Sequence, residues 1–388
     1  MKKILIVTGN YLPGYKDGGP IRSLENLTEA LGDAYEFYIM ASDRDLGEDH
    51  PYAQLTRDHT LEYNTWNRVE NAYVWYVKDG IFRKKEIEEL SRDKDLIYFT
   101  SFYREYGRYI LSLKKEGKLE GKPVVIASMG VFSQGALQIK AFKKKCYITL
   151  LKTLGYFKGI IWSVTSEREE EELKKVIGQE ADCRIAEDLP RKPIPLPAHT
   201  YEPDRLKIVF LSRIVDKKNL EYACRVLTEA AKHTDGRLLF HIYGPREDRS
   251  YWEKCEKILD QSPLNIEWEY RGEVPAEQVP MVLAGYDVFL FPTKGENYGH
   301  VIYEALMAGC IPVISDQTPW EDFRERELGY VEPLSEISAT NGFVKAIVKL
   351  AAASGEQKEQ WSGRGIQYAA DRCEKAYKDT GYRRIFDL

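Results

Sequence analysis

The sequence lacks several features that would define a class of protein at once. Its six cysteines are scattered and form no Cys-x-x-Cys pair, which excludes the common zinc and thiol-redox motifs and favours a reduced, intracellular protein. No apolar run approaches the roughly 18–20 residues that a membrane-spanning helix needs. The run 4–7 is also too short for the core of a signal peptide, so we interpret it as a buried first strand.

An excess of positive charge is absent as well. Lys+Arg number 56 and Asp+Glu number 61, a formal net charge of −5, so no global basic field indicates a nucleic-acid partner. With 43% hydrophobic and 30% charged residues among 388, the composition is typical of a globular protein of two or three domains. We therefore expect a cytoplasmic protein, soluble or at most peripheral at the inner face of a membrane.

Short apolar runs alternate with segments of helical spacing along most of the chain. The expected strands form two series: 4–8, 37–41, 96–100 and 123–127, then 208–211, 238–243, 266–270, 288–292 and 311–315. The expected helices are 22–31, 84–90, 219–232, 277–284 and 299–308. Such alternation predicts an α/β fold with parallel, doubly wound sheets.

A proline-rich segment separates the two series. Four prolines within residues 189–197 exclude a helix or a central strand and predict a stiff linker. The sequence thus predicts two Rossmann-like domains, 1–197 and 198–371, facing a cleft. Open parallel sheets bind ligands beyond the carboxyl ends of their strands, which makes that cleft the expected site.

The most informative segment is 292–315, which has the pattern of a strand, a glycine-containing turn, a helix and another strand. Glu296 lies in the turn, and Glu304 follows about two helical turns later on the same side. The backbone N–H groups of Asn297, Tyr298 and Gly299 would point away from the helix start and favour an anion. Carboxylates that accept bonds from sugar hydroxyls, beside a helix end that holds phosphates, suit a nucleotide sugar.

This segment resembles the E-x7-E motif of retaining glycosyltransferases of the GT-B fold, family 4. Further motifs of that family follow in its order over nearly the whole chain: Gly18-Gly19-Pro20 before a helix, Arg213 with Lys218 five residues later, and Gly244-Pro245 after a strand. By this resemblance residues 372–388 pack back on the N-terminal domain, which receives the acceptor.

The resemblance also implies roles for individual residues. Arg213 and Lys218 would hold the donor diphosphate and neutralise the leaving group, while Glu296 holds hydroxyls of the transferred sugar. Glu304 would bind the ribose. The remaining donor-binding candidates are Gly18, Gly19, Gly244, Pro245, Asn297, Tyr298 and Gly299. No metal and no cofactor is expected, because the nucleotide sugar is a co-substrate.

The N-terminal domain departs from the family pattern in one loop. Where many members have a histidine, this chain reads Ser128-Met129-Gly130-Val131, so a donor contact there would fall to the backbone or to Ser128. Asp43-Arg44-Asp45 mimics the metal motif of another glycosyltransferase fold. We interpret it as a strand end, with Asp45 as a candidate acceptor contact.

Residues 121–166 contain seven lysines and no Asp or Glu. Aromatic residues are interleaved with these lysines, and a capping box of Ser166 and Glu169 starts the next helix. We expect a basic, aromatic face that meets an anionic acceptor or membrane surface, with Lys140, Lys143, Lys144 and Lys145 as candidates. The alternative is an ordinary lysine-rich helix in water.

Together these features predict a retaining hexosyltransferase that moves a sugar, from UDP-sugar before GDP-sugar, to a glycan or lipid-linked saccharide in surface polysaccharide or glycoconjugate assembly. The alternatives are a nucleotide-sugar epimerase of the same fold and a non-catalytic nucleotide- or glycan-binding protein. A dinucleotide oxidoreductase is disfavoured, because the turn after the first strand, 9–14, has no Gly-x-Gly-x-x-Gly.

Overall fold

The computed structural model describes residues 1–138 and 141–388 and divides the chain into two compact units. The first unit combines Met1–Leu189 with Lys375–Leu388, and the second is Pro190–Glu374. The division thus falls before the proline-rich linker, not after it, and the returning segment begins at Lys375 instead of residue 372. Arg191 gives the reason, because its guanidinium donates a hydrogen bond to the carbonyl of Ala276 in the second unit, 3.1 Å away.

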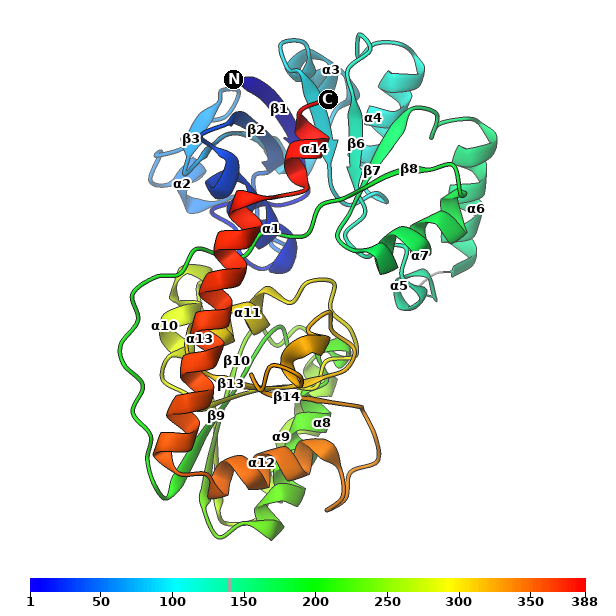
Figure 1. Ribbon diagram of the computed structural model, residues 1–388. Coiled ribbons are helices and arrows are strands. Elements are labelled where there is room, and N and C mark those ends of the chain that lie inside the picture. The colour runs from blue at the N-terminus through cyan, green and yellow to red at the C-terminus, as the bar shows by residue number, and fades with distance from the viewer. Residues whose placement is uncertain (139–140) are drawn as a thin grey trace. The chain divides into compact units, whose positions relative to one another are not determined.

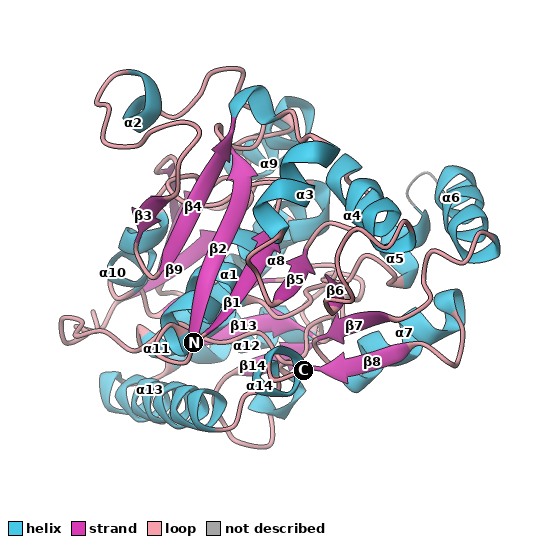
Figure 2. Ribbon diagram, turned by 90° about the horizontal axis from the view of Figure 1, so that it is seen from above, coloured by secondary structure: helices cyan, strands magenta, loops and turns pink. Residues whose placement is uncertain are grey.

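The first unit contains an eight-stranded sheet of order β3-β4-β2-β1-β5-β6-β7-β8, parallel except for β3. Figure 2 shows β4, β2 and β1 running side by side. The strands are β1 Lys2–Val7, β2 Tyr35–Ser42, β3 Asn67–Val69, β4 Ala72–Val77, β5 Leu96–Phe99, β6 Val124–Ala127, β7 Ile160–Val164 and β8 Asp182–Ile185. The helices are α1 Gly19–Leu31, α2 Ala53–Thr56, α3 Lys84–Ser91, α4 Glu105–Lys115, α5 Gln134–Gln138, α6 Ala141–Thr153, α7 Glu167–Ile177 and α14 Tyr382–Phe386.

Strand β1 shows why the central strands are continuous apolar runs. Ile4 and Ile6 join one hydrophobic cluster, while Leu5 and Val7 join a second cluster on the other face of the sheet. Successive side chains of a strand point to opposite faces, and helices cover both faces here, so every residue of the run is buried.

The end of the chain packs on the first unit, where α14 (red in Figure 1) lies against the sheet. The Phe386 ring contacts those of Tyr35 and Phe37 at centroid distances of 5.4 and 5.9 Å. The Lys2 ammonium donates to the backbone oxygen of Leu388 at 2.6 Å. Apolar and polar contacts therefore both fix this segment.

The second unit has a six-stranded parallel sheet of order β11-β10-β9-β12-β13-β14. Its strands are β9 Arg205–Leu211, β10 Arg237–Tyr243, β11 Ile266–Tyr270, β12 Val288–Phe291, β13 Ile311–Ser315 and β14 Tyr330–Glu332. Its helices are α8 Leu220–Ala230, α9 Arg249–Asp260, α10 Val279–Leu283, α11 His300–Met307, α12 Gly342–Ala352 and α13 Gly355–Lys378, the last ending in the first unit. The strand order reverses at β9 and β12, which is where open sheets of this kind bind ligands.

The predicted α/β fold with two Rossmann-like sheets is confirmed. Sequence analysis missed β3, β4, β7, β8 and β14; β7 lies inside the lysine-rich segment that was interpreted as a surface face. Among the described residues, no helix combines the length and apolar character that crossing a membrane requires.

Asp188 is a buried carboxyl group that accepts a hydrogen bond from the Tyr382 hydroxyl at 3.3 Å and so helps to hold α14. Burial raises the pKa of Asp188 to about 6 from its ordinary 3.8, and the nearby Glu169 charge adds to this. Between these values the native state holds more protons than the unfolded state, so stability falls as the pH rises through this interval.

We predict that Asp188→Asn raises the free energy of unfolding at about pH 7 by about 1–3 kcal/mol and leaves it nearly unchanged at about pH 4. Chemical denaturation at the two pH values measures the difference. Asp33→Asn, an exposed carboxylate of the same unit, is the control. An equal effect of Asp188→Asn at both pH values would contradict the argument.

Candidate functional site

The candidate site of the second unit begins where β9 ends. Arg213 lies two residues after the strand, and a single turn of 3-10 helix, Asp216–Lys218, leads into α8. The Lys218 ammonium donates to the Glu296 carboxylate at 2.6 Å, and their side chains are only 15% and 11% exposed. The two residues are separated by 78 positions in the chain, so the fold, not local sequence, makes this ion pair.

Several further bonds hold the loop of Glu296 against the loop of Lys218. The Thr293 hydroxyl donates to the same Glu296 oxygen at 2.9 Å. The Asn219 side-chain amide donates to the carbonyl of Pro292 at 2.9 Å. The Lys294 backbone N–H donates to the carbonyl of Lys217, also at 2.9 Å. The ends of β9 and β12 therefore form one rigid edge.

Arg213 and Lys217 add positive charge to this edge. The Arg213 guanidinium lies 3.5 Å from the Glu247 carboxylate and is 36% exposed. Partial burial lowers the pKa of Lys217, the charges of Lys218 and Arg213 lower it further, and Glu296 opposes them. Sequence analysis missed Lys217, although its place next to Lys218 was the available signal. Three cations in the loop after β9, one of them paired with Glu296, can bind a polyphosphate.

Gly244 brings the next strand end close to Arg213. Its φ is +131°, and a Cβ atom there would lie 1.8 Å from the Ser212 carbonyl oxygen. The Ile214 N–H donates to the carbonyl of Pro245 at 2.9 Å, which ties the two loops together. Gly244 and Pro245 thus shape the edge that carries Arg213.

Helix α11 supplies the second carboxylate. Gly299 precedes the helix with φ +83°, and the carbonyl of Tyr298 accepts a 2.5 Å bond from the Trp320 indole. The Tyr298 side chain is buried, so only its backbone is placed to meet a ligand. The N-terminus of α11, next to Asn297, is an end where backbone dipoles favour negative charge.

Glu304 lies within α11 and is 5% exposed. The Arg191 guanidinium lies 3.8 Å from a Glu304 carboxylate oxygen and is itself mostly buried. Arg191 comes from the linker, and sequence analysis missed it because nothing local connects residue 191 with α11. The structure thus pairs Lys218 with Glu296 and Glu304 with Arg191, while Arg213 lies in the loop of Lys218 and pairs with Glu247.

In the first unit, Gly18 and Gly19 begin α1. Gly18 has φ +68°, which disfavours any other residue, whereas a Cβ atom on Gly19 would meet nothing within 4 Å. Asp45 is buried and accepts backbone bonds from Tyr15 at 2.9 Å and Lys16 at 3.1 Å, so it anchors the loop before α1. Its acceptor contact stays a prediction.

The carboxylate of Asp43 is likewise bonded to neighbouring groups of the first unit. It pairs with Arg44 at 2.9 Å and accepts bonds from the Tyr63 hydroxyl at 2.8 Å and the Asp79 N–H at 3.0 Å. Both aspartates of the motif that mimics a metal site therefore serve the loop at the end of β2.

The loop after β6 stands where the family pattern has a histidine. Ser128 is fully buried, and its hydroxyl lies 2.7 Å from Glu169 and 3.0 Å from the carbonyl of Ser163. The Ser128 side chain is therefore engaged inside the first unit, and a donor contact made by this loop stays a prediction. In the predicted capping box, the Glu169 N–H does donate to Ser166, but the Glu169 carboxylate bonds Thr165 and Gly130.

The predicted basic, aromatic face is only partly correct. Phe132, Tyr147, Phe157 and Trp162 pack around Phe102 at centroid distances of 5.4–6.0 Å, so they belong to the core of the first unit.

The four candidate lysines also differ from one another. The Lys144 ammonium donates to the carbonyl of Ala136 at 2.6 Å and lies over the Tyr103 ring, so it points inward. Lys143 and Lys145 are exposed, and Lys140 lies outside the described residues.

The two units have the architecture of GT-B glycosyltransferases. Residues 197–360, less than half of the chain, match the family model described as glycosyl transferases group 1. A stretch of 114 residues is 28% identical to sulfoquinovosyl transferase SQD2 of Arabidopsis thaliana, a match that covers 29% of this chain and 20% of that protein.

Two solved structures share the fold over the full length of both chains. The sucrose-phosphate synthase of Thermosynechococcus elongatus is 14% identical with a TM-score of 0.70. An α,α-trehalose-phosphate synthase (UDP-forming) of Burkholderia xenovorans, in complex with glucose-6-phosphate, is 9% identical with a TM-score of 0.67. Part of the chain is therefore similar to group 1 glycosyltransferases, and the neighbouring structures are glycosyltransferases of this fold.

We predict that Gly244→Ala lowers the free energy of unfolding by about 2–4 kcal/mol, because a methyl group must displace the backbone of Ser212 and the backbone becomes strained. Chemical denaturation measures the effect. In the control, Gly363→Ala in α13 meets no atom within 4 Å and should leave stability unchanged or slightly raised. Comparable behaviour of the two variants would show that the close approach at Gly244 is unimportant.

Proposed function

We propose that this protein is a retaining glycosyltransferase of family 4 that transfers a hexose from a nucleotide sugar to a glycan or lipid-linked saccharide. The observation that carries the proposal is the Lys218–Glu296 pair, which joins the loops after β9 and β12, with Arg213 in the same loop as Lys218. Cations and a carboxylate held at one strand edge suit a ligand that carries both phosphates and hydroxyls.

The chemistry follows from where charge develops. Breaking the bond between the sugar and the diphosphate leaves negative charge on the leaving oxygen, and preorganised cations stabilise that charge. Arg213 offers a planar fork to phosphate oxygens, and the Lys218 ammonium has three N–H donors, one of which serves Glu296. Both side chains would bind the diphosphate.

The two carboxylates would recognise the sugars. Glu296 is oriented by Lys218 and by the Thr293 hydroxyl, so its second oxygen can accept bonds from hydroxyls of the transferred hexose. Glu304 would accept bonds from the ribose hydroxyls. We assign no covalent nucleophile and propose a front-face displacement, with the incoming acceptor and the leaving diphosphate on the same face of the sugar.

UDP is the proposed nucleotide. The trehalose-phosphate synthase neighbour is described as UDP-forming, and HepE of Anabaena, a further neighbour with a TM-score of 0.65, is described in complex with UDP-glucose. Surface polysaccharide or glycoconjugate assembly in the cytoplasm is the proposed setting, and no metal ion is assigned to the reaction.

The test is a calorimetric titration of the protein with UDP, GDP and ADP, followed by an assay of sugar transfer from the bound nucleotide's sugar conjugate. We predict that one nucleoside diphosphate binds and that Arg213→Ala or Lys218→Ala lowers kcat by about 10- to 100-fold, since a charge-assisted contact contributes about 1.5–3 kcal/mol.

Lys232→Ala, an exposed lysine of the same unit, is the control and should be unaffected. Absence of nucleotide binding would overturn the proposal. Interconversion of the donor sugar without any acceptor would identify an epimerase instead, and binding without turnover would identify a non-catalytic protein.

Arg191 generates a second prediction. Its guanidinium lies 3.8 Å from the carboxylate proposed to bind ribose and offsets the charge of that group, so Arg191→Ala should weaken nucleoside diphosphate binding by about 3- to 10-fold, with a smaller effect for Arg191→Lys. Calorimetry measures it. Arg237→Ala, at the start of β10, is the control; equal affinities for Arg191→Ala and the control would remove Arg191 from the site.

A further inference from the structure

Helix α6 exposes apolar side chains on the side that faces away from the first unit. Ile148 and Leu151 point inward and are buried. On the opposite side the exposed residues recur at helical spacing, and we call them the outer face of α6: Phe142, Cys146, Thr149, Leu150 and Thr153. Phe142 is 82% exposed and Leu150 is 56% exposed, and Leu154 just beyond the helix is 46% exposed. Large apolar side chains gathered in this way mark an interaction surface.

Lysines flank the outer face on both sides. At 100° per residue, Lys143 lies along one side of the stripe and Lys145 and Lys152 lie along the other. Within the described residues, none of the three lies within 4.0 Å of a carboxylate. Exposed lysines on other helices of the first unit do find one, for example Lys85 with Glu89 in α3 and Lys175 with Glu171 in α7. The positive charge around the outer face is therefore left uncompensated.

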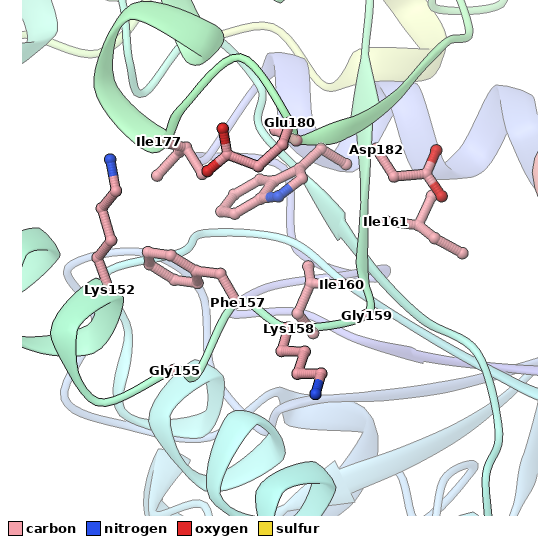
Figure 3. A pocket seen from close by; sticks show the side chains of 12 residues that line it. Lys152, Gly155, Phe157, Lys158, Gly159, Ile160, Ile161, Ile177, Glu180 and Asp182 are labelled. Carbon is pink, nitrogen blue, oxygen red and sulfur yellow. The ribbon is translucent and has the colours of Figure 1, made fainter.

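A pocket of about 490 Å³ opens at the end of α6 and extends this surface. Figure 3 shows Lys152 and Phe157 on one side of the pocket, with Ile160 beside Phe157 and Lys158 lower in the view. Glu180 and Asp182 line the side of β8, so the pocket itself carries both signs of charge. Selection for an anionic partner must therefore come from α6 and not from the pocket.

We propose that the outer face of α6 docks on the surface of an anionic lipid bilayer. An apolar stripe bordered by lysines matches the boundary between acyl chains and headgroups, because the apolar side chains enter the acyl region while the long lysine stems reach back to the phosphates. Residues 121–166 contain lysines but no Asp or Glu, so the segment that includes α6 is positively charged and complements the negative charge of the lipid headgroups. This proposal is independent of the proposed catalytic function.

The first experiment measures binding of the full-length protein to sedimented vesicles, made either of phosphatidylcholine alone or of an equimolar mixture with phosphatidylglycerol. Each lysine near an anionic surface strengthens binding about fivefold, so the protein should prefer the anionic vesicles by about a hundredfold. Raising the salt concentration should reduce this preference.

Variants then assign the binding to α6. Replacing Lys143, Lys145 and Lys152 together by Gln should reduce binding to anionic vesicles by about a hundredfold, and Phe142→Ala should reduce it by about tenfold. The matched controls remove exposed side chains from the second unit: the triple change of Lys254, Lys257 and Lys345 to Gln, and Leu264→Ala, a fully exposed leucine. The controls should bind as the parent protein does.

Cys146 gives a readout of the surface itself, because it lies on the outer face and is the exposed one of the six cysteines. An environment-sensitive fluorophore on Cys146 should shift to shorter wavelength with anionic vesicles and stay unchanged with neutral ones.

Three results would overturn the proposal: equal or no binding to the two vesicle types, equal losses in the α6 and control variants, or an unshifted fluorophore on bound protein. A dimer in the absence of lipid that Phe142→Ala dissociates would also overturn it and identify a protein interface instead.

Discussion

The ion pair between Lys218 and Glu296 is the interaction on which the arrangement of the second unit's site depends. At 2.6 Å, with both side chains largely shielded from water, neither charge can lose its partner without a large cost. The pair joins the loop after β9 to the loop after β12, the two strands at which the sheet order reverses. It thereby ties the loop that carries Arg213 to the loop that precedes α11.

The same edge concentrates unusual backbone conformations. Asn219 and Gly299, which precede α8 and α11, adopt left-handed conformations, and Gly244 has a positive φ against the backbone of Ser212. For a residue other than glycine, such as Asn219, this conformation costs free energy and persists where the surrounding structure enforces it. Here the enforcement comes from a parallel sheet whose strands are buried on both faces, so the stability of the sheet supports the geometry of its ligand-binding edge.

In the first unit, the polar side chains at the ends of the strands bond to the protein itself. Asp45, Ser128 and Glu169 direct their side-chain oxygens to neighbouring loops and helix starts, so they stabilise the unit itself. Its distinctive surface lies instead on α6, where Phe142 faces outward although it would gain free energy by burial. The two units thus share a topology but place their uncompensated groups in different positions: cations at a strand edge in one, and an apolar stripe with lysines on a helix in the other.

The sequence by itself determined the two-sheet α/β architecture, because apolar runs and helical spacing are local signals and the central strands are buried on both faces. It also determined which segment carries Glu296 and Glu304. Tertiary structure decided the rest, because packing partners are distant in the chain. Lys143 and Lys144 are neighbours in sequence, yet one faces solvent and the other the Tyr103 ring; four aromatic residues of the lysine-rich segment join the core around Phe102. Arg191 meets Glu304 only because the linker folds onto the second unit, a contact that no periodicity or motif encodes.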